Sequence, residues 1–165
     1  MAVRPVNKLP DRVLKARAEE VGDLSEERLV EDLLETMHAS PACVGLAAPQ
    51  IGVSRRVIAV DVSAHPKTTV NHGLVVLIDP VVLESSGREV AREGCMSVPD
   101  LTANVARATS IVVRGRTPGG DDMIVATEGF EARAFQHEID HLDGLLILDR
   151  VDSLATDVFR RRVYK

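Results

Sequence analysis

The segment Gln136-His137-Glu138-Ile139-Asp140-His141 decides how this chain is interpreted. An α-helix places residues four apart on one face, roughly 6 Å apart along the axis. His137 and His141 can therefore bind one small divalent cation between them. Glu138 then lies beside the first ligand, where it can act as a general base toward a water on the metal. The spacing predicts a metal-binding helix with a catalytic carboxylate.

The third metal ligand has to come from elsewhere in the chain. A catalytic site of this kind takes three protein ligands and leaves one position open. Residues 142–149, which follow His141, include neither His nor Glu. Upstream, Cys95 lies between a glycine and a short polar turn, and a thiolate is a good ligand for zinc or ferrous iron. The alternative is a small buried apolar residue, as most free cysteines are. We expect Cys95 to be the ligand and Cys43, the other cysteine, to play no part.

A third segment, Cys43-Val44-Gly45-Leu46-Ala47-Ala48-Pro49-Gln50, is small and apolar with one polar side chain. The amide of Gln50 can both donate and accept hydrogen bonds. Gly45 indicates a place where another backbone approaches closely. Taken alone, the segment is also typical of simple tight packing.

Together the three segments resemble the peptide deformylase family. That family carries G-x-G-x-A-A-x-Q, E-G-C-x-S and Q-H-E-x-D-H in this order, and the chain has all three at similar spacing. Residues 3–6 and 10–14 are also similar to the family's N-terminal segment. The resemblance covers nearly the whole chain. It implies hydrolysis of the formyl group from the N-terminal formylmethionine of new polypeptides, with release of formate.

The resemblance implies a metal site made by Cys95, His137 and His141. A metal with an open position lowers the pKa of its bound water from about 15.7 toward neutrality. Glu138 would take a proton from this attacking water and later deliver one to the departing amine. We expect ferrous iron as the native ion, with zinc, nickel or cobalt as alternatives, because ligand affinity does not choose among them in the cell.

The resemblance also implies how the substrate is held. The side chain of Gln50 and the backbone N–H of Met96 would stabilise the oxyanion. An N-formyl-methionyl nascent peptide would pair with a strand edge and place its methionine in a pocket. The residues implied for these contacts are Val44, Gly45, Glu93, Phe130, Arg133 and Ala134. Phe130 and Ala134 share one helix face, so a core role suits them equally well.

Composition limits the alternatives. The 165 residues fit a single domain, 1–165, without a Gly/Ser-rich linker or internal repeat. No apolar run approaches the about 20 residues of a membrane helix, and the first residues lack the apolar core of a signal peptide. A thiolate ligand favours a reducing compartment, which together with the family predicts the bacterial cytoplasm. The net charge of −5 gives no support to nucleic-acid binding.

The order of the elements predicts an α+β fold, with antiparallel or mixed β-sheets packed around the ligand helix. The helices expected from apolar periodicity and caps are an N-terminal helix from Asp23 or Ser25 to about Ala39, the ligand helix from Phe130 to about Leu142, and a C-terminal helix over Leu154–Val163. The expected strands are Val57–Val62, Leu74–Ile78, Ser110–Arg114 and Met123–Thr127. Residues 100–107 are interpreted as a turn, and His65 and His72 as surface residues.

The last stretch, Arg160-Arg161-Arg162-Val163-Tyr164-Lys165, is strongly basic. Such a run is usually a solvated helix end whose charge complements the helix dipole. The family resemblance adds a second interpretation, because in some deformylases a basic C-terminal helix docks on the ribosome.

Four positions depart from the family pattern. Cys43 replaces the first glycine of its motif, and Met96 stands where leucine is commonest. Thr102 occupies a position where many members carry arginine, which predicts altered substrate affinity. Glu131 replaces a common apolar residue, and the sequence does not explain it. Asp140 lies inside the ligand motif but off the ligand face, so it is assigned no chemistry.

Two other functions compete with deformylation. A zinc peptidase can use the same helix, but its third ligand would come from an unusual place and Cys95 and Gln50 would have no function. An inactive scaffold with a structural metal is the second alternative. Structural sites normally have four protein ligands, and the retained Glu138 would then be unexplained.

Overall fold

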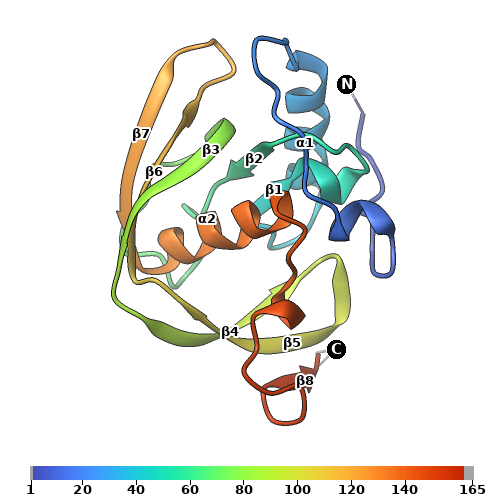
Figure 1. Ribbon diagram of the computed structural model, residues 1–165, viewed down its shortest axis with the longest axis vertical. Coiled ribbons are helices and arrows are strands. Elements are labelled where there is room, and N and C mark those ends of the chain that lie inside the picture. Colours follow the sequence, from blue (N-terminus) through green and yellow to red (C-terminus); the bar gives the residue numbers. More distant parts are fainter. Residues whose placement is uncertain (1, 162–165) are drawn as a thin grey trace.

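A computed structural model describes residues 2–161 of the chain, and these form an α+β fold (Figure 1). The two α-helices are α1 (Glu27–Ala39) and α2 (Gly129–Leu142). The 3-10 helices are η1 (Arg12–Lys15), η2 (Ala48–Ile51) and η3 (Ile147–Asp149). The strands are β1 (Gly45–Ala47), β2 (Val57–Val60), β3 (Val75–Ser86), β4 (Glu89–Cys95), β5 (Val98–Arg107), β6 (Ser110–Arg116), β7 (Asp122–Glu128) and β8 (Val158–Arg160).

The strands form two antiparallel sheets. One has five strands in the order β1-β2-β3-β6-β7, and the other has three in the order β4-β5-β8. Figure 1 shows α2 crossing the middle of the molecule, with the five-stranded sheet on one side and the three-stranded sheet below it. The predicted arrangement of sheets around a central ligand helix is therefore confirmed.

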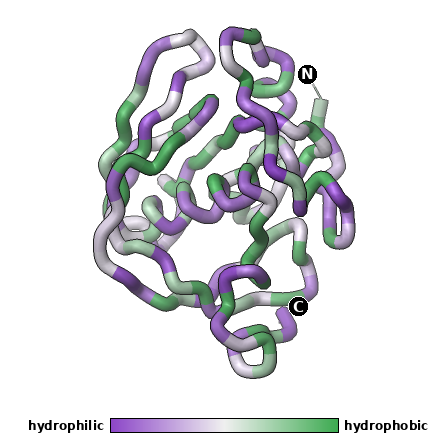
Figure 2. Tube along the Cα trace, viewed as in Figure 1, coloured by the Kyte–Doolittle hydropathy of each residue, from purple (hydrophilic) through white to green (hydrophobic). Residues whose placement is uncertain are grey.

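Packing of α2 on the five-stranded sheet creates the main core. Phe135 and Leu142 of the helix are fully buried against β-branched residues of the sheet, among them Ile58 and Val60. Figure 2 shows hydrophobic stretches in the strands that surround this helix. A fully buried side chain of this size contributes about 1.5–3 kcal/mol relative to an exposed one, so this contact fixes the position of the helix.

The opposite face of the sheet is covered by α1 at β1 and β2. Along β2, Val57 and Ala59 alternate with Ile58 and Val60. Val57 and Ala59 pack with Leu33 of α1. Because successive strand residues point to opposite faces, β2 is buried on both sides and is apolar throughout. The predicted N-terminal helix is confirmed, although it starts at Glu27 and has no side-chain cap from the preceding residues.

The predicted C-terminal helix over Leu154–Val163 is wrong for its described part. Residues 154–157 form turns, and residues 158–160 form β8, while residues 162 and 163 lie outside the described part of the chain. β8 pairs with the open edge of β5, and Asp157 accepts the N–H of Ser153 at 3.0 Å. Pairing with a distant strand edge overrides the local helical pattern.

The interpretation of residues 100–107 as a turn is also wrong, because they belong to β5. The hairpin of β4 and β5 was missed. β4 is largely exposed and polar, so it carries no apolar alternation that would indicate a strand. Strand β3 likewise extends beyond the predicted end at Ile78, to Ser86, through an exposed stretch.

The loop before β3 explains why a glutamate, Glu131, is buried in α2. Its carboxylate accepts the backbone N–H of His72 at 2.7 Å and the hydroxyl of Thr127 at 2.7 Å, and pairs with Nδ1 of His72 at 2.5 Å. His72 therefore has a buried partner and is more than the isolated surface residue that the sequence predicted. The contact ties the loop over residues 63–73 to the first turn of α2.

Within residues 2–161, no helix is both long enough and apolar enough to span a bilayer.

Glu131→Ala should lower the free energy of unfolding by about 2 kcal/mol, because it leaves the partners of a buried carboxylate unsatisfied. Urea unfolding followed by circular dichroism measures the change. Glu31→Ala, which removes an exposed carboxylate from α1, is the matched control and should have little effect. Equal stability of the two variants would contradict this account of Glu131.

Candidate metal centre

Three predicted ligands meet where the end of β4 faces α2. Cys95 is the last residue of β4, and His137 and His141 lie one turn apart on α2. Ligand atoms of these three residues all lie within 4.8 Å of one another. Nε2 of His141 is 3.3 Å from the sulfur of Cys95. Cys43, the other cysteine, is not a member of this cluster, as predicted.

Glu93 orients the first histidine. Its Oε1 is 2.9 Å from Nδ1 of His137, and this contact leaves Nε2 of that ring as the ligand atom. A carboxylate on the far nitrogen of a ligand histidine fixes the ring and increases its basicity. The sequence placed Glu93 at the substrate pocket, and this orienting contact was missed.

Glu93 is itself held by two arginines. Oε2 accepts from Nε of Arg107 at 2.8 Å and from Nη1 of Arg133 at 2.5 Å, and Oε1 accepts from Nη2 of Arg107 at 2.9 Å. Burial alone would raise the pKa of Glu93, but the hydrogen bonds and charges of Arg107 and His137 outweigh burial and hold the pKa well below its ordinary value. Glu93 is therefore a carboxylate at every physiological pH.

Asp140 extends this network to the chain after α2. Oδ2 of Asp140 accepts from Nη1 of Arg107 at 2.6 Å, and Oδ1 accepts from Nη2 of Arg150 at 2.7 Å. Among the described residues, the carboxylate of Asp140 binds Arg107 and Arg150 and forms no hydrogen bond with His137 or His141. Asp140 instead holds Arg107, the arginine that binds Glu93, and this contact explains its place in the ligand motif.

The cluster favours positive charge. Burial by itself would lower the pKa of His137, but its hydrogen bonds with Cys95 and Glu93 outweigh burial and raise the pKa well above its ordinary value. The pKa of His141 is lowered well below its ordinary value, first by burial and then by the charge of His137. A divalent cation at Nε2 of His137 would supply the favoured charge in place of the proton. One sulfur and two imidazole nitrogens also match the ligands of zinc and iron sites, so these residues fit the metal.

Glu138 points into the same centre. Among buried side-chain atoms of the described residues, its Oε1 and Nδ1 of His141 have no hydrogen-bond partner. Burial raises the pKa of Glu138 to about 7, although the charges of nearby cationic residues oppose the increase. A carboxyl group poised near neutrality can both accept and deliver a proton.

Gly45 is needed because Glu138 approaches it closely. A Cβ added at Gly45 would lie 2.6 Å from Oε2 of Glu138 and 2.9 Å from its Cγ. The sequence predicted the close approach of a backbone at this glycine, but the side chain of Glu138 approaches instead. β1 and α2 therefore confine the carboxylate on one side.

The orientation of Gln50 is determined by its neighbours. Its Oε1 accepts the backbone N–H of Ala47 at 3.0 Å, so its NH2 group faces the metal centre. Nε2 donates to the hydroxyl of Ser97 at 3.2 Å and lies 3.7 Å from the sulfur of Cys95. Met96 directly follows Cys95, in the turn between β4 and β5. Gln50 and Met96, the two residues predicted to supply the oxyanion donors, both line the pocket described next.

A pocket of about 340 Å3 opens onto the cluster. Every residue predicted for catalysis, metal binding or substrate binding lines it, apart from the fully buried His141. Ala134 and Phe130 line this pocket and also pack on the main core. Arg133 donates to Glu93 and to the carbonyls of Val105 and Glu89, so its guanidinium serves the protein interior.

Several lining residues were missed by sequence reasoning: Pro41, Ala42, Cys43, His65, Lys67, Arg92, Gly94 and Arg161. His65, predicted to be a surface residue, stacks on Phe130 with 4.2 Å between ring centroids. Cys43 donates its S–H to the carbonyl of Gly45 at 3.1 Å, and burial, followed by the charge of Glu138, raises its pKa to about 11. Cys43 is therefore a protonated thiol in the lining of this pocket. No local sequence pattern indicated the other missed lining residues.

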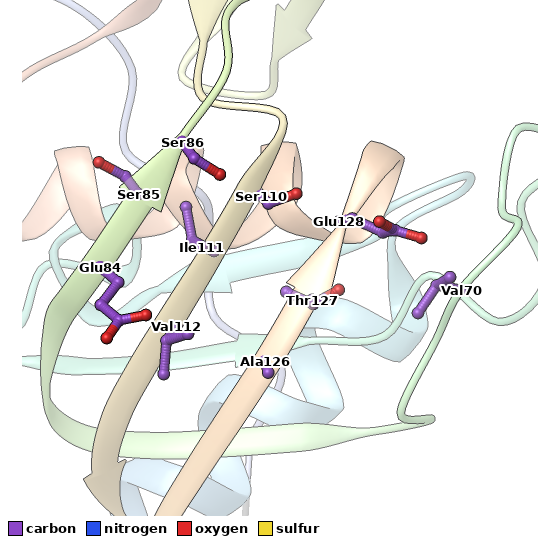
Figure 3. A pocket seen from close by; sticks show the side chains of 10 residues that line it. All are labelled: Val70, Glu84, Ser85, Ser86, Ser110, Ile111, Val112, Ala126, Thr127 and Glu128. Carbon is purple, nitrogen blue, oxygen red and sulfur yellow. The ribbon is translucent and has the colours of Figure 1, made fainter.

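A second hollow, of about 450 Å3, lies over β3, β6 and β7 (Figure 3). The side chains around it include three serines and two carboxylates, those of Glu84 and Glu128, which stand on different strands. None of the predicted site residues lines it, and among the described residues the only His, Cys, Asp and Glu grouping suited to a metal is the one at Cys95. The chemistry of this chain is therefore assigned to the pocket of α2.

Known proteins agree with the motifs. Residues 3–157 match the model of the polypeptide deformylase family. The chain is 38% identical to the peptide deformylase of Thermodesulfovibrio yellowstonii, over 98% of this chain and 97% of that protein. It is 43% identical to the peptide deformylase of Halothermothrix orenii, over 96% of this chain and 99% of that protein.

Solved structures agree as well. The peptide deformylase of Thermotoga maritima superposes with a TM-score of 0.82 at 36% identity, covering 93% of this chain and 100% of that one. The Met-Ala-Ser-bound peptide deformylase of Acinetobacter baumannii superposes with a TM-score of 0.83 at 36% identity, covering 91% of this chain and 99% of that one. Sequence, fold and the grouped ligand residues lead to one conclusion: this chain belongs to the polypeptide deformylase family.

Proposed function

We propose that the residues of this pocket remove the formyl group from the N-terminal formylmethionine of new polypeptides, with Cys95, His137 and His141 as metal ligands. The observation that carries the proposal is the position of Glu138. Its buried, unpartnered Oε1 lies beside three ligand residues whose binding atoms are within 4.8 Å of one another. Such an arrangement supports hydrolysis rather than a purely structural metal site.

The bound ion would polarise the formyl carbonyl and make water a better nucleophile near neutral pH. Glu138 takes the proton of the attacking water on its carboxylate and then gives a proton to the departing nitrogen. Its pKa of about 7 suits both steps, because the two protonation states are then equally accessible. Gly45 leaves the space in which this carboxylate stands.

Gln50 and Met96 act on the formyl oxygen. The amide of Gln50 is held by Ala47 so that an N–H is directed at the centre throughout the reaction. The backbone N–H of Met96 is the second donor. Fixed donors of this kind stabilise developing negative charge without reorganising, and each contributes about 3 kcal/mol to the barrier reduction.

The remainder of the substrate lies along β1. This strand is the edge of the five-stranded sheet, so Val44 and Gly45 can pair with an extended peptide through main-chain hydrogen bonds. Phe130 and Ala134 contribute apolar surface for the methionine side chain. Glu93 and Arg133 also line this pocket, but their polar atoms bind each other, so they shape the pocket without needing to bind the substrate directly. The related Acinetobacter baumannii enzyme, solved with Met-Ala-Ser, supports a peptide of this kind as ligand.

Ferrous iron is our proposal for the native ion, with zinc, nickel and cobalt as alternatives. A thiolate with two imidazoles suits all four, so metal availability decides among them. Elemental analysis of protein purified without oxygen tests this, and we expect iron. Zinc at full occupancy would overturn the iron assignment while leaving the mechanism intact.

We also propose that the reaction takes place in the bacterial cytoplasm, because the new polypeptides that serve as substrate are translated there. The basic C-terminal helix expected to dock on the ribosome is not present in the described part of the chain. The described part of that segment is a turn followed by β8, and Arg162–Lys165 lie outside the described residues.

Formate release from formyl-Met-Ala-Ser by the metal-loaded protein tests the proposed function. We expect turnover that stops when the metal is chelated. Cleavage of the peptide bonds of unformylated Met-Ala-Ser would instead indicate a peptidase. Absence of both reactions in the loaded protein would leave the scaffold interpretation and refute our proposal.

Cys95→Ala should abolish tight metal binding, because it removes the charged ligand and leaves two imidazoles. Cys43→Ala is the matched control, since it removes the other thiol of the same pocket without touching the ligand cluster. Metal content after dialysis measures both. Equal retention or equal loss of metal in the two variants would contradict the ligand assignment.

Glu138→Gln should keep the metal and lower kcat by about 10²- to 10⁴-fold, because the amide fills the space but cannot accept a proton. Gly45→Ala should also lower kcat, since the added Cβ overlaps the place of the Glu138 carboxylate. Steady-state kinetics with parallel metal analysis measure both. Near-normal turnover of Glu138→Gln at full metal occupancy would rule out its role as general base.

A further inference from the structure

Strand β8 brings a cation to the mouth of the metal pocket. β8 pairs with β5, with Thr102 opposite Phe159, and the N–H of Arg161 donates to the carbonyl of Asp100 at 2.8 Å. The half-buried side chain of Arg161 lines the same pocket as the ligand Cys95. A segment that is remote in sequence thus reaches the site.

Gly94 provides the space for this side chain. A Cβ added at Gly94 would overlap Nη2 of Arg161. Gly94 directly precedes the ligand Cys95, and consecutive Cα atoms are only about 3.8 Å apart. The guanidinium of Arg161 therefore lies against the strand that carries the ligand, one residue before it.

The guanidinium of Arg161 has no hydrogen-bond or ion-pair partner among residues 2–161. The other two arginines that line the pocket have partners within the protein. Arg133 binds Glu93, while Arg92 lies 3.5 Å from the ring centroid of Phe159 and donates to Asn104. Arg161 is therefore the arginine of this pocket whose guanidinium has no partner among the described residues.

We propose that Arg161 binds a negatively charged group in the peptide segment that follows the formylmethionine, and so sets a preference for acidic substrates. The inference rests on the proposed function. An extended peptide rises about 3.3 Å per residue, so a formyl group at the metal ligands brings the second or third residue of the substrate to Gly94 and Arg161. A guanidinium binds a carboxylate there through paired N–H donors.

The strand pairing fixes the place of this cation. Thr102 lies opposite Gly94 in the hairpin and opposite Phe159 in β8. Arg161 follows two residues after Phe159, so β8 places its guanidinium beside Gly94.

Paired peptides test the proposal. The formyl-Met-Ala-Glu and formyl-Met-Glu-Ala amides are compared with versions in which Gln replaces Glu. In the wild type, kcat/KM for at least one acidic peptide should exceed that of its Gln twin about two- to fivefold at low salt, mainly through KM. Salt of about 0.5 M should bring the ratio close to one, because it screens an exposed pair.

Arg161→Gln should bring the acidic preference close to one. Arg160→Gln removes the same charge from the neighbouring exposed position of β8 and should retain both the preference and the turnover of the neutral peptides. A wild-type ratio of one, or an equal loss of preference in the two variants, would overturn the proposal. So would a fall in kcat shared by all peptides in Arg161→Gln, since that indicates a structural role.

Measuring how tightly the unformylated product peptides bind tests the role of Arg161 without requiring that the protein remove formyl groups. The amides of Met-Ala-Glu and Met-Glu-Ala, with their Gln twins, are titrated into the metal-loaded wild type and both variants. The same about two- to fivefold preference, lost only in Arg161→Gln, supports Arg161 whether or not formate is released. No preference in wild-type binding contradicts it, while failure of formate release alone counts against the proposed function.

Discussion

Glu93 binds the charged groups on which the rest of the site depends. Its carboxylate receives Arg107 from β5, Arg133 from α2 and Nδ1 of His137. One buried group thereby joins the three-stranded sheet to the ligand helix and orients a ligand ring. Removing one partner of a buried ionic network costs about 3–5 kcal/mol, so the network is also a constraint on how the two sheets meet. Metal geometry and fold are coupled through this residue.

The fold brings the chemical groups together by crowding them around α2. Apolar packing of Phe135 fixes the helix on the five-stranded sheet, and the polar face then meets β4. Glycines allow the close approaches at this face, Gly45 for Glu138 and Gly94 for Arg161. Burial has a chemical consequence as well, because it raises the pKa of Glu138 into the range where the group can exchange protons near neutrality. Packing and catalysis thus use the same contacts.

Local sequence patterns predicted the parts of the molecule that are locally determined. The helix α2, α1 and four of the core strands follow from apolar periodicity, and the grouping of Cys95, His137 and His141 follows from motif spacing and residue chemistry. Pairing between distant segments was not predictable in this way. β8 replaced an expected helix because β5 offers an open edge, and Glu131 was explained only once His72 lay beside it. The role of Glu93 was missed for the same reason.

The most direct test of the account compares two carboxylates of one network. The carboxylate of Glu93 binds His137, whereas the carboxylate of Asp140 binds Arg107 and Arg150 and, among the described residues, forms no hydrogen bond with Cys95, His137 or His141. Cobalt affinity, measured by chelator competition on folded protein, should fall about 10- to 100-fold in Glu93→Gln and remain near the wild-type value in Asp140→Asn. An unchanged affinity in Glu93→Gln, or an equal loss in both variants, would contradict the claim that Glu93 orients the metal site.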